Sequence, residues 1–225
     1  MTVIDIRAGA ELPANREEVE FQTADGLTLV GELATPIGRA PVATLLTLHP
    51  LPTHGGFMDS HVIRKAANRL PALVDFAESQ GVFDGGKDER LDVEAALEFV
   101  ASRDLPNVWL LGWSFGTELA LKYGSDKNIR GVILLSPPLH RTSVEELQAW
   151  VGSPKRVVAI VPEFDDYLTP DPARERFSVI PHAEVVAIEG AKHLWVGENA
   201  TKAVLDEVVR VIAPDKVPLP TTFDV

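Results

Sequence analysis

Gly112–Trp113–Ser114–Phe115–Gly116 is the stretch that decides the fold, because it predicts a strand, a sharp turn and a helix with a serine at the turn. The residues before it, Asn107 to Leu111, form a short apolar run of the kind found in buried parallel strands. The residues after it, Thr117 to Tyr123, have a helical pattern, and Gly124 is placed to end that helix. The flanking glycines allow a tight turn without Cβ clashes and leave the serine hydroxyl above the sheet. Ser114 is therefore a candidate nucleophile, and the alternative is a serine in a glycine-rich turn that carries no chemistry.

His193 is the candidate base for this serine. It follows the strand-like segment Glu184–Ile188 and precedes a helical segment, Asn199–Ile212. A histidine on such a loop lies at the carboxyl edge of a parallel sheet, where ligands bind in open α/β folds. The alternative, a surface histidine without a role, is weakened because an acid lies between Ser114 and His193 in the chain, as the order of such triads requires.

Three carboxylates follow the apolar strand Arg156–Val161 and compete for the role of the acid. A carboxylate here would accept the imidazole Nδ1–H, fix the tautomer of the ring and stabilise the imidazolium. We favour Asp165, because successive loop residues point in different directions and only one of them can meet the ring. Asp166 and Glu163 stay as alternatives.

A further motif lies upstream, His49–Pro50–Leu51–Pro52 followed by Gly55–Gly56–Phe57–Met58. With these motifs the chain resembles the α/β-hydrolases, and more narrowly the small cap-less bacterial serine hydrolases that carry an H-P-x-P…G-G-x-M motif. The likeness covers nearly the whole chain. In that family an aromatic residue follows the acid by two positions and a proline comes a little later, which Tyr167 and Pro170 match for Asp165. The resemblance implies a catalytic triad of Ser114, Asp165 and His193.

The same resemblance implies two backbone donors for an oxyanion hole. One is the N–H of Phe115, the residue after the nucleophile, and the other belongs to the loop that carries the upstream motif. Pro50 and Pro52 have no N–H, so Leu51 is the expected second donor.

Strand-like and helical segments alternate along the chain, which predicts an α/β fold with a mostly parallel sheet and helices on both faces. An antiparallel N-terminal hairpin is expected from Val19–Gln22 and Leu27–Ala34, with a turn at Asp25–Gly26. The further strands are expected at Ala43–His49, Val108–Leu111, Val132–Ser136, Arg156–Val161 and Glu184–Ile188. Ser143 and Glu146 form a capping-box signature for a short helix.

Residues 137–155 leave room for one helix between two strands, so we expect no cap domain and an open cleft at the serine. Between Leu70 and Val82 the segment is too short for the buried strand, loop and helix start of the related proteins. We therefore expect either a deletion here or a flexible loop near the active site that is absent from this sequence. About half of the following apolar residues should face the substrate pocket: Leu51, Phe57, Met58, Trp113, Phe115, Pro137, Pro138, Leu168 and Trp195.

Composition narrows the class of protein. At 225 residues, 45% hydrophobic and 24% charged, the chain can bury one large core, and we expect a single domain over residues 1–225. The absence of Cys excludes a thiol nucleophile, a disulfide framework and a thiolate metal site. A net charge of −12 argues against a nucleic-acid partner. With no long apolar run and no signal-peptide layout, we expect no membrane partner and a cytoplasmic protein.

Three histidines within thirteen residues, His49, His54 and His61, raise the question of a metal site. His49 should end a strand and His61 should begin a helix, so the three side chains are not expected to converge. We expect no metal and no cofactor.

The resemblance implies hydrolysis of a small-molecule carboxylic ester, and the expected lack of a cap predicts a short acyl group, because remote acyl carbons would gain little burial. Thioesterase, peptidase and lactone hydrolase activities use the same machinery and stay open. A catalytically silent binding protein of the same fold is the alternative from another class, and it is disfavoured because no triad member is missing. An exposed apolar rim around a lidless site would suit a homodimer.

Overall fold

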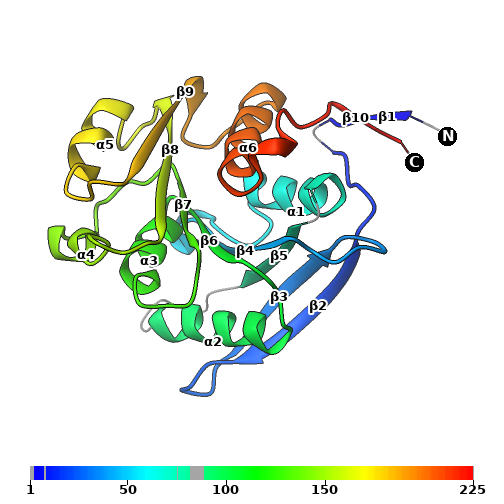
Figure 1. The fold of residues 1–225 in the computed structure, drawn as a ribbon, viewed down its shortest axis with the longest axis horizontal. Coiled ribbons are helices and arrows are strands. Elements are labelled where there is room, and N and C mark those ends of the chain that lie inside the picture. Colours follow the sequence, from blue (N-terminus) through cyan, green and yellow to red (C-terminus); the bar gives the residue numbers. More distant parts are fainter. Residues whose placement is uncertain (1–2, 8, 75, 82–88, 225) are drawn as a thin grey trace.

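The computed structural model describes residues 3–7, 9–74, 76–81 and 89–224, and within them one eight-stranded sheet carries helices on both faces (Figure 1). The strands lie in the order β2, β3, β5, β4, β6, β7, β8, β9, and β1 and β10 form a separate antiparallel pair. The elements in chain order are β1 (Val3–Asp5), β2 (Asn15–Gln22), β3 (Thr28–Thr35), β4 (Ala43–Leu48), η1 (Pro52–His54), α1 (His61–Val74), β5 (Phe76–Gly81), α2 (Glu89–Ser102), β6 (Val108–Trp113), α3 (Phe115–Gly124), β7 (Gly131–Leu135), α4 (Val144–Gln148), β8 (Arg156–Phe164), α5 (Pro170–Phe177), β9 (Glu184–Lys192), α6 (Glu198–Ile212), η2 (Pro214–Lys216) and β10 (Thr222–Asp224).

The predicted mixture of a parallel sheet and an N-terminal hairpin is confirmed. The hairpin is β2 and β3, and Gly26 takes φ 86° at its turn, a left-handed conformation that glycine adopts without strain. β3 also pairs antiparallel with β5, whereas every neighbouring pair from β5 to β9 is parallel. The carboxyl ends of β4, β6, β7, β8 and β9 therefore meet at one edge of the sheet.

The central strands are buried on both faces, which explains why they are apolar without alternation. Leu45 and Leu111 pack with α1 and α6 on one face. Their chain neighbours Leu46 and Leu110 pack with α2 and α3 on the other face. Because successive strand residues point to opposite faces, a continuous apolar run serves both layers of helices.

The expectation that the segment after Leu70 is too short to hold a buried strand is wrong. α1 continues to Val74, and β5 begins at Phe76, between β3 and β4. The six-residue β5 therefore lies within the segment that we expected to be too short for a strand. Of the region 75–86, residues 75 and 82–86 lie outside the described residues.

The connection from β7 to β8 holds a single short helix, α4, and no cap domain, as predicted. Ser143 is the N-cap of α4, and its hydroxyl accepts the N–H of Glu146 while the Glu146 carboxylate accepts the N–H of Ser143. The capping box predicted from the sequence is therefore present.

Candidate active site

Ser114 lies at the sharp turn between β6 and α3. Its φ of 52° and ψ of −117° are rare for a residue with a side chain, and such strain persists only where the surroundings enforce it. The Ser114 N–H donates to the carbonyl of Leu135 at 2.9 Å, which ties the turn to the end of β7. The two glycines of the motif permit close backbone contacts: a Cβ on Gly112 would lie 2.4 Å from the carbonyl oxygen of Gly116, and one on Gly116 would lie 2.0 Å from that of Leu48.

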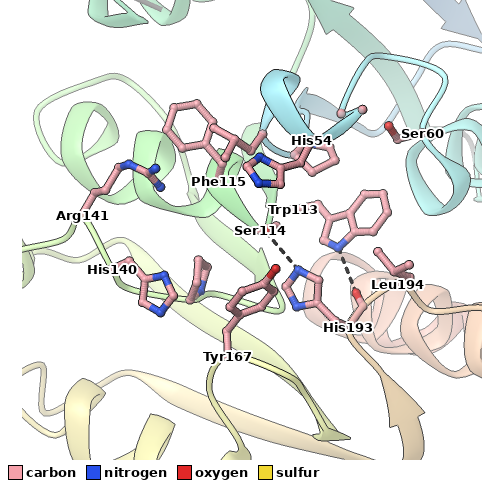
Figure 2. A pocket seen from close by; sticks show the side chains of 15 residues that line it. His54, Ser60, Trp113, Ser114, Phe115, His140, Arg141, Tyr167, His193 and Leu194 are labelled. Carbon is pink, nitrogen blue, oxygen red and sulfur yellow. Dashed lines mark hydrogen bonds between the residues drawn. The ribbon is translucent and has the colours of Figure 1, made fainter.

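The structure brings Ser114, His193 and Asp165 into one chain of hydrogen bonds. Ser114 Oγ lies 3.0 Å from His193 Nε2, and His193 Nδ1 lies 2.9 Å from Asp165 Oδ2 (Figure 2 shows the first of these). An ionised carboxylate only accepts hydrogen bonds, so Nδ1 carries the proton and Nε2 is left to accept the serine O–H. This is the arrangement in which a histidine can take a proton from a serine.

Asp165, rather than Asp166 or Glu163, meets the histidine. The Asp165 side chain is 1% exposed. Its Oδ1 accepts the N–H groups of Tyr167 at 2.9 Å and Leu168 at 3.2 Å. Asp166 is exposed, and Glu163 accepts the N–H of Gly190 at 2.7 Å instead. The three alternatives are thus separated by the partner that each carboxylate meets.

The pKa of the Asp165 carboxyl lies below its usual value. Burial alone would raise this pKa, but the hydrogen bond and charge of His193 and the two backbone N–H groups outweigh the burial. The carboxyl therefore stays ionised at neutral pH. Because the folded state holds this proton less tightly than the unfolded chain, the resulting stabilisation is present above the ordinary pKa and is lost as the pH falls through the lowered one.

Three further side chains hold His193, and sequence reasoning assigned this role to none of them. The His193 carbonyl accepts hydrogen bonds from Trp113 Nε1 and from Ser136 Oγ, each at 3.2 Å. The Tyr167 ring contacts the imidazole edge to face, with centroids 4.6 Å apart. The two hydrogen bonds therefore fix the backbone of His193, and the contact with Tyr167 fixes its ring. Only Tyr167 had a sequence signal, its position two residues after the acid.

The loop after β4 presents the predicted oxyanion donors. Leu51 and Phe115 both line the cavity, and neither N–H donates a hydrogen bond to any other residue that the structure describes. Phe115 is the first residue of α3, where backbone N–H groups have no partner inside the helix. His49 braces the loop, since its Nδ1 donates to the Pro50 carbonyl at 2.7 Å. Burial lowers the pKa of His49, outweighing that hydrogen bond, so the ring is neutral.

A cavity of about 380 Å³ opens beside Ser114 (Figure 2). Its walls come from the loop after β4, the turn between β6 and α3 that carries Ser114, the loop after β7 and the loops that carry Asp165 and His193. The lining residues are Pro50, Leu51, His54, Gly55, Gly56, Ser60, Trp113, Ser114, Phe115, Pro138, His140, Arg141, Tyr167, His193 and Leu194.

Four residues expected in the substrate pocket, Phe57, Met58, Leu168 and Trp195, do not line this cavity. The reasons lie in packing. Trp195 is fully buried among α1 and α6, and Leu168 packs against the core on the α3 side. Phe57 is 51% exposed, and Met58 is half-buried outside the cavity. Pro137 is likewise absent from the lining, whereas Leu51, Trp113, Phe115 and Pro138 line the cavity.

Comparison with known proteins places this geometry in a known fold. No protein-family model matches the chain. The protein XC6422 of Xanthomonas campestris, described as an α/β serine hydrolase without lid, is 22% identical with a TM-score of 0.73, covering 92% of this chain and 99% of its own. The esterase domain of a Rhodothermus marinus protein is 18% identical with a TM-score of 0.66, covering 88% and 98%. The uncharacterized protein RP471 of Rickettsia prowazekii is 25% identical over 197 residues, which are 77% of this chain and 80% of RP471. The chain has the α/β-hydrolase fold.

In this α/β-hydrolase fold His49, His54 and His61, the three histidines considered for a metal site, point to different partners. His49 bonds the Pro50 carbonyl, His54 Nδ1 lies 3.1 Å from Thr53 Oγ1, and His61 Nε2 lies 2.9 Å from the Trp195 carbonyl. Within the described ranges no three histidine, aspartate or glutamate side chains gather into a group that could hold a metal ion. Nor does any helix in those ranges combine the length and the apolar character that crossing a bilayer requires.

Replacing Gly116 by Ala should destabilise the protein by at least about 1–3 kcal/mol, because the new Cβ would overlap a backbone carbonyl that cannot move freely. Urea unfolding followed by circular dichroism measures the change. Gly9→Ala is the matched control, since a Cβ there meets nothing within 4 Å. Unfolding of Gly116→Ala at the wild-type urea concentration would contradict the proposed tight contact.

Proposed function

We propose that this protein is a serine hydrolase that cleaves small carboxylic esters with short acyl groups. The observation that carries the proposal is the unbroken hydrogen-bond chain from Ser114 through His193 to Asp165 at the wall of a cavity. Support of a coarser kind comes from proteins of the same fold that are named as a serine hydrolase and an esterase domain.

In the first half of the reaction, Ser114 Oγ attacks the ester carbonyl while His193 Nε2 takes the serine proton. The ionised Asp165 stabilises the imidazolium through Nδ1–H. The carbonyl oxygen becomes an oxyanion, which the N–H groups of Leu51 and Phe115 would bind. The partial positive charge at the start of α3 acts in the same direction. The C–O bond then breaks, the alcohol leaves with the proton from His193, and an acyl-Ser114 ester remains.

In the second half, water takes the place of the alcohol. His193 removes a proton from the water as it attacks the acyl carbonyl, and the same oxyanion donors hold the second tetrahedral intermediate. The intermediate collapses to the carboxylic acid, and His193 returns the proton to Ser114. His193 and the oxyanion donors thus act in both halves of the reaction from the same positions. The reaction therefore requires a histidine whose position is fixed.

A fluorophosphonate probe should label the wild-type protein at Ser114, because an activated serine hydroxyl attacks such a phosphorus centre. Ser114→Ala should remain unlabelled, and peptide mass spectrometry identifies the site. Ser143→Ala, at the exposed helix cap, is the control and should be labelled as wild type is. A folded wild-type protein that stays unlabelled would point to a silent binding protein instead.

Asp165→Asn should lower kcat by about 10⁴-fold, because the amide cannot hold the imidazole in the required tautomer. The neighbouring exposed residue supplies the control, and Asp166→Asn should change kcat far less. Steady-state hydrolysis of 4-nitrophenyl acetate measures both variants. Equal losses, or a larger loss for Asp166→Asn, would place the acid elsewhere.

Specificity for acyl length should follow from the small open cavity. Each buried CH₂ contributes about 0.8 kcal/mol, and this gain should stop once the chain extends beyond the cavity. A plot of log(kcat/KM) for 4-nitrophenyl esters should rise and then flatten or fall beyond roughly four to six acyl carbons. A steady rise to long chains, or activation on emulsions, would contradict a short-acyl enzyme.

A further inference from the structure

Arg141 gives the cavity wall a positive charge that the proposed mechanism does not use. The chain carries 33 Asp and Glu residues and a net charge of −12. None of those acids is among the described residues that line the cavity, whereas Arg141 is one of them. Figure 2 shows its side chain along the same wall as Phe115, with His140 beside it on the loop after β7. The described cavity wall is therefore locally positive, although the protein as a whole is strongly acidic.

A buried carboxylate binds the Arg141 backbone and lies near its guanidinium. Glu118, on α3, is only 2% exposed, and its Oε1 accepts the backbone N–H of Arg141 at 2.5 Å. Its Oε2 lies 3.6 Å from Arg141 Nη1. The guanidinium carbon also lies 5.6 Å from the centroid of the Phe115 ring, a distance suited to a cation–π contact. The same helix thus positions the proposed oxyanion donor and the arginine.

The loop that carries Arg141 is fixed from a second direction. Arg176, on α5, donates through Nη2 to the carbonyls of Leu139 at 3.2 Å and Thr142 at 3.4 Å. Leu139 is itself 2% exposed and packs in the core on the α3 side. The loop is thereby anchored on both sides of Arg141. A ligand that binds Arg141 therefore does not have to order the loop, which removes one of the entropic costs of binding.

The guanidinium retains donors for a ligand. Arginine has five N–H groups, and the described contacts of this one are a long ion pair to Glu118 and the contact with Phe115. Its side chain is 55% exposed, so a bound ligand can reach it. Carboxylates match the planar fork of a guanidinium with two parallel hydrogen bonds.

We propose that Arg141 is a specificity-determining residue and that the substrates are esters which themselves carry a carboxylate. The inference rests on the proposed function, since it concerns the substrate of the same serine. The free carboxylate binds Arg141 while the ester carbonyl lies at Ser114. Because nothing else in the described wall is formally charged except the histidines when protonated, Arg141 distinguishes an acid from the neutral amide of the same shape.

Two series of methyl or acetyl esters test this. The first holds the carboxylate on the acyl side: monomethyl succinate, glutarate and adipate. The second holds it on the alcohol side: the acetate esters of glycolate, 3-hydroxypropanoate and 4-hydroxybutanoate. Each compound is compared with its primary amide, and kcat/KM is measured by pH-stat titration. In wild type the best acid should exceed its amide about tenfold, a magnitude typical of a partly exposed charged hydrogen bond.

Variants assign the preference to the guanidinium. Arg141→Met should bring the acid-to-amide ratio to about one, and Arg141→Lys should retain part of it because the charge remains. Arg130→Met is the control, since Arg130 is an exposed arginine just before β7, at the opposite edge of the sheet, and should leave the ratio unchanged. Thermal unfolding of each variant separates selectivity from the loss of the ion pair to Glu118.

The outcomes separate this inference from the proposed function. A ratio near one in wild type, or an unchanged ratio in Arg141→Met, would overturn the role of Arg141 while neutral esters and fluorophosphonate labelling still support a serine hydrolase. A lower melting temperature of Arg141→Met with an unchanged ratio would leave the arginine as a partner of Glu118 alone, which also overturns it. If no ester is hydrolysed and Ser114 is not labelled, the proposed function fails and this inference fails with it.

Discussion

The first turn of α3 packs backbone to backbone against the end of β4, and the position of Ser114 depends on that contact. Gly116 has no room for a Cβ against the Leu48 carbonyl, and Gly112 has none against Gly116. A helix that starts so close to the sheet forces the residue before it into a left-handed conformation. The same contact brings the free N–H of Phe115 next to the loop after β4. One steric condition thus sets both the serine and a proposed oxyanion donor.

The sheet supplies the remaining alignment. In its parallel part β6 lies between β4 and β7, and Leu48, Gly112 and Leu134 are at the same level through their pairings. The loops that follow these strands, together with those after β8 and β9, leave the sheet at a common edge. The parallel strands therefore bring together four residues that are far apart in sequence, at positions 51, 114, 165 and 193. The loops then need only short hydrogen bonds, such as Asp165 to two backbone N–H groups, to fix the final directions.

The fold, the serine and the histidine were predictable because each rests on local rules: apolar strands, glycines at a turn and the order of the residues. The acid was predictable to within three candidates, and only the direction of each side chain in the loop separates Asp165 from Asp166. The pocket was less predictable. An apolar residue near a site can serve the core equally well, and Trp195 does so at 0% exposure. β5 was missed because α1 ends at Val74 and β5 begins at Phe76, so the sequence holds no run of turn residues to mark the boundary.

An open cavity changes which interactions can select a substrate. Without a cap, an acyl chain soon reaches water, so additional methylene groups bring little further burial and apolar contacts discriminate weakly. Polar groups on anchored loops then carry more of the selection, because a hydrogen bond to a fixed charge depends on direction as well as on contact area. The loop after β7 occupies the place where a cap would otherwise be inserted, and it is held by Glu118 from α3 and Arg176 from α5. If Arg141 acts as proposed, this short anchored loop and its guanidinium would shape the substrate pocket in place of a lid.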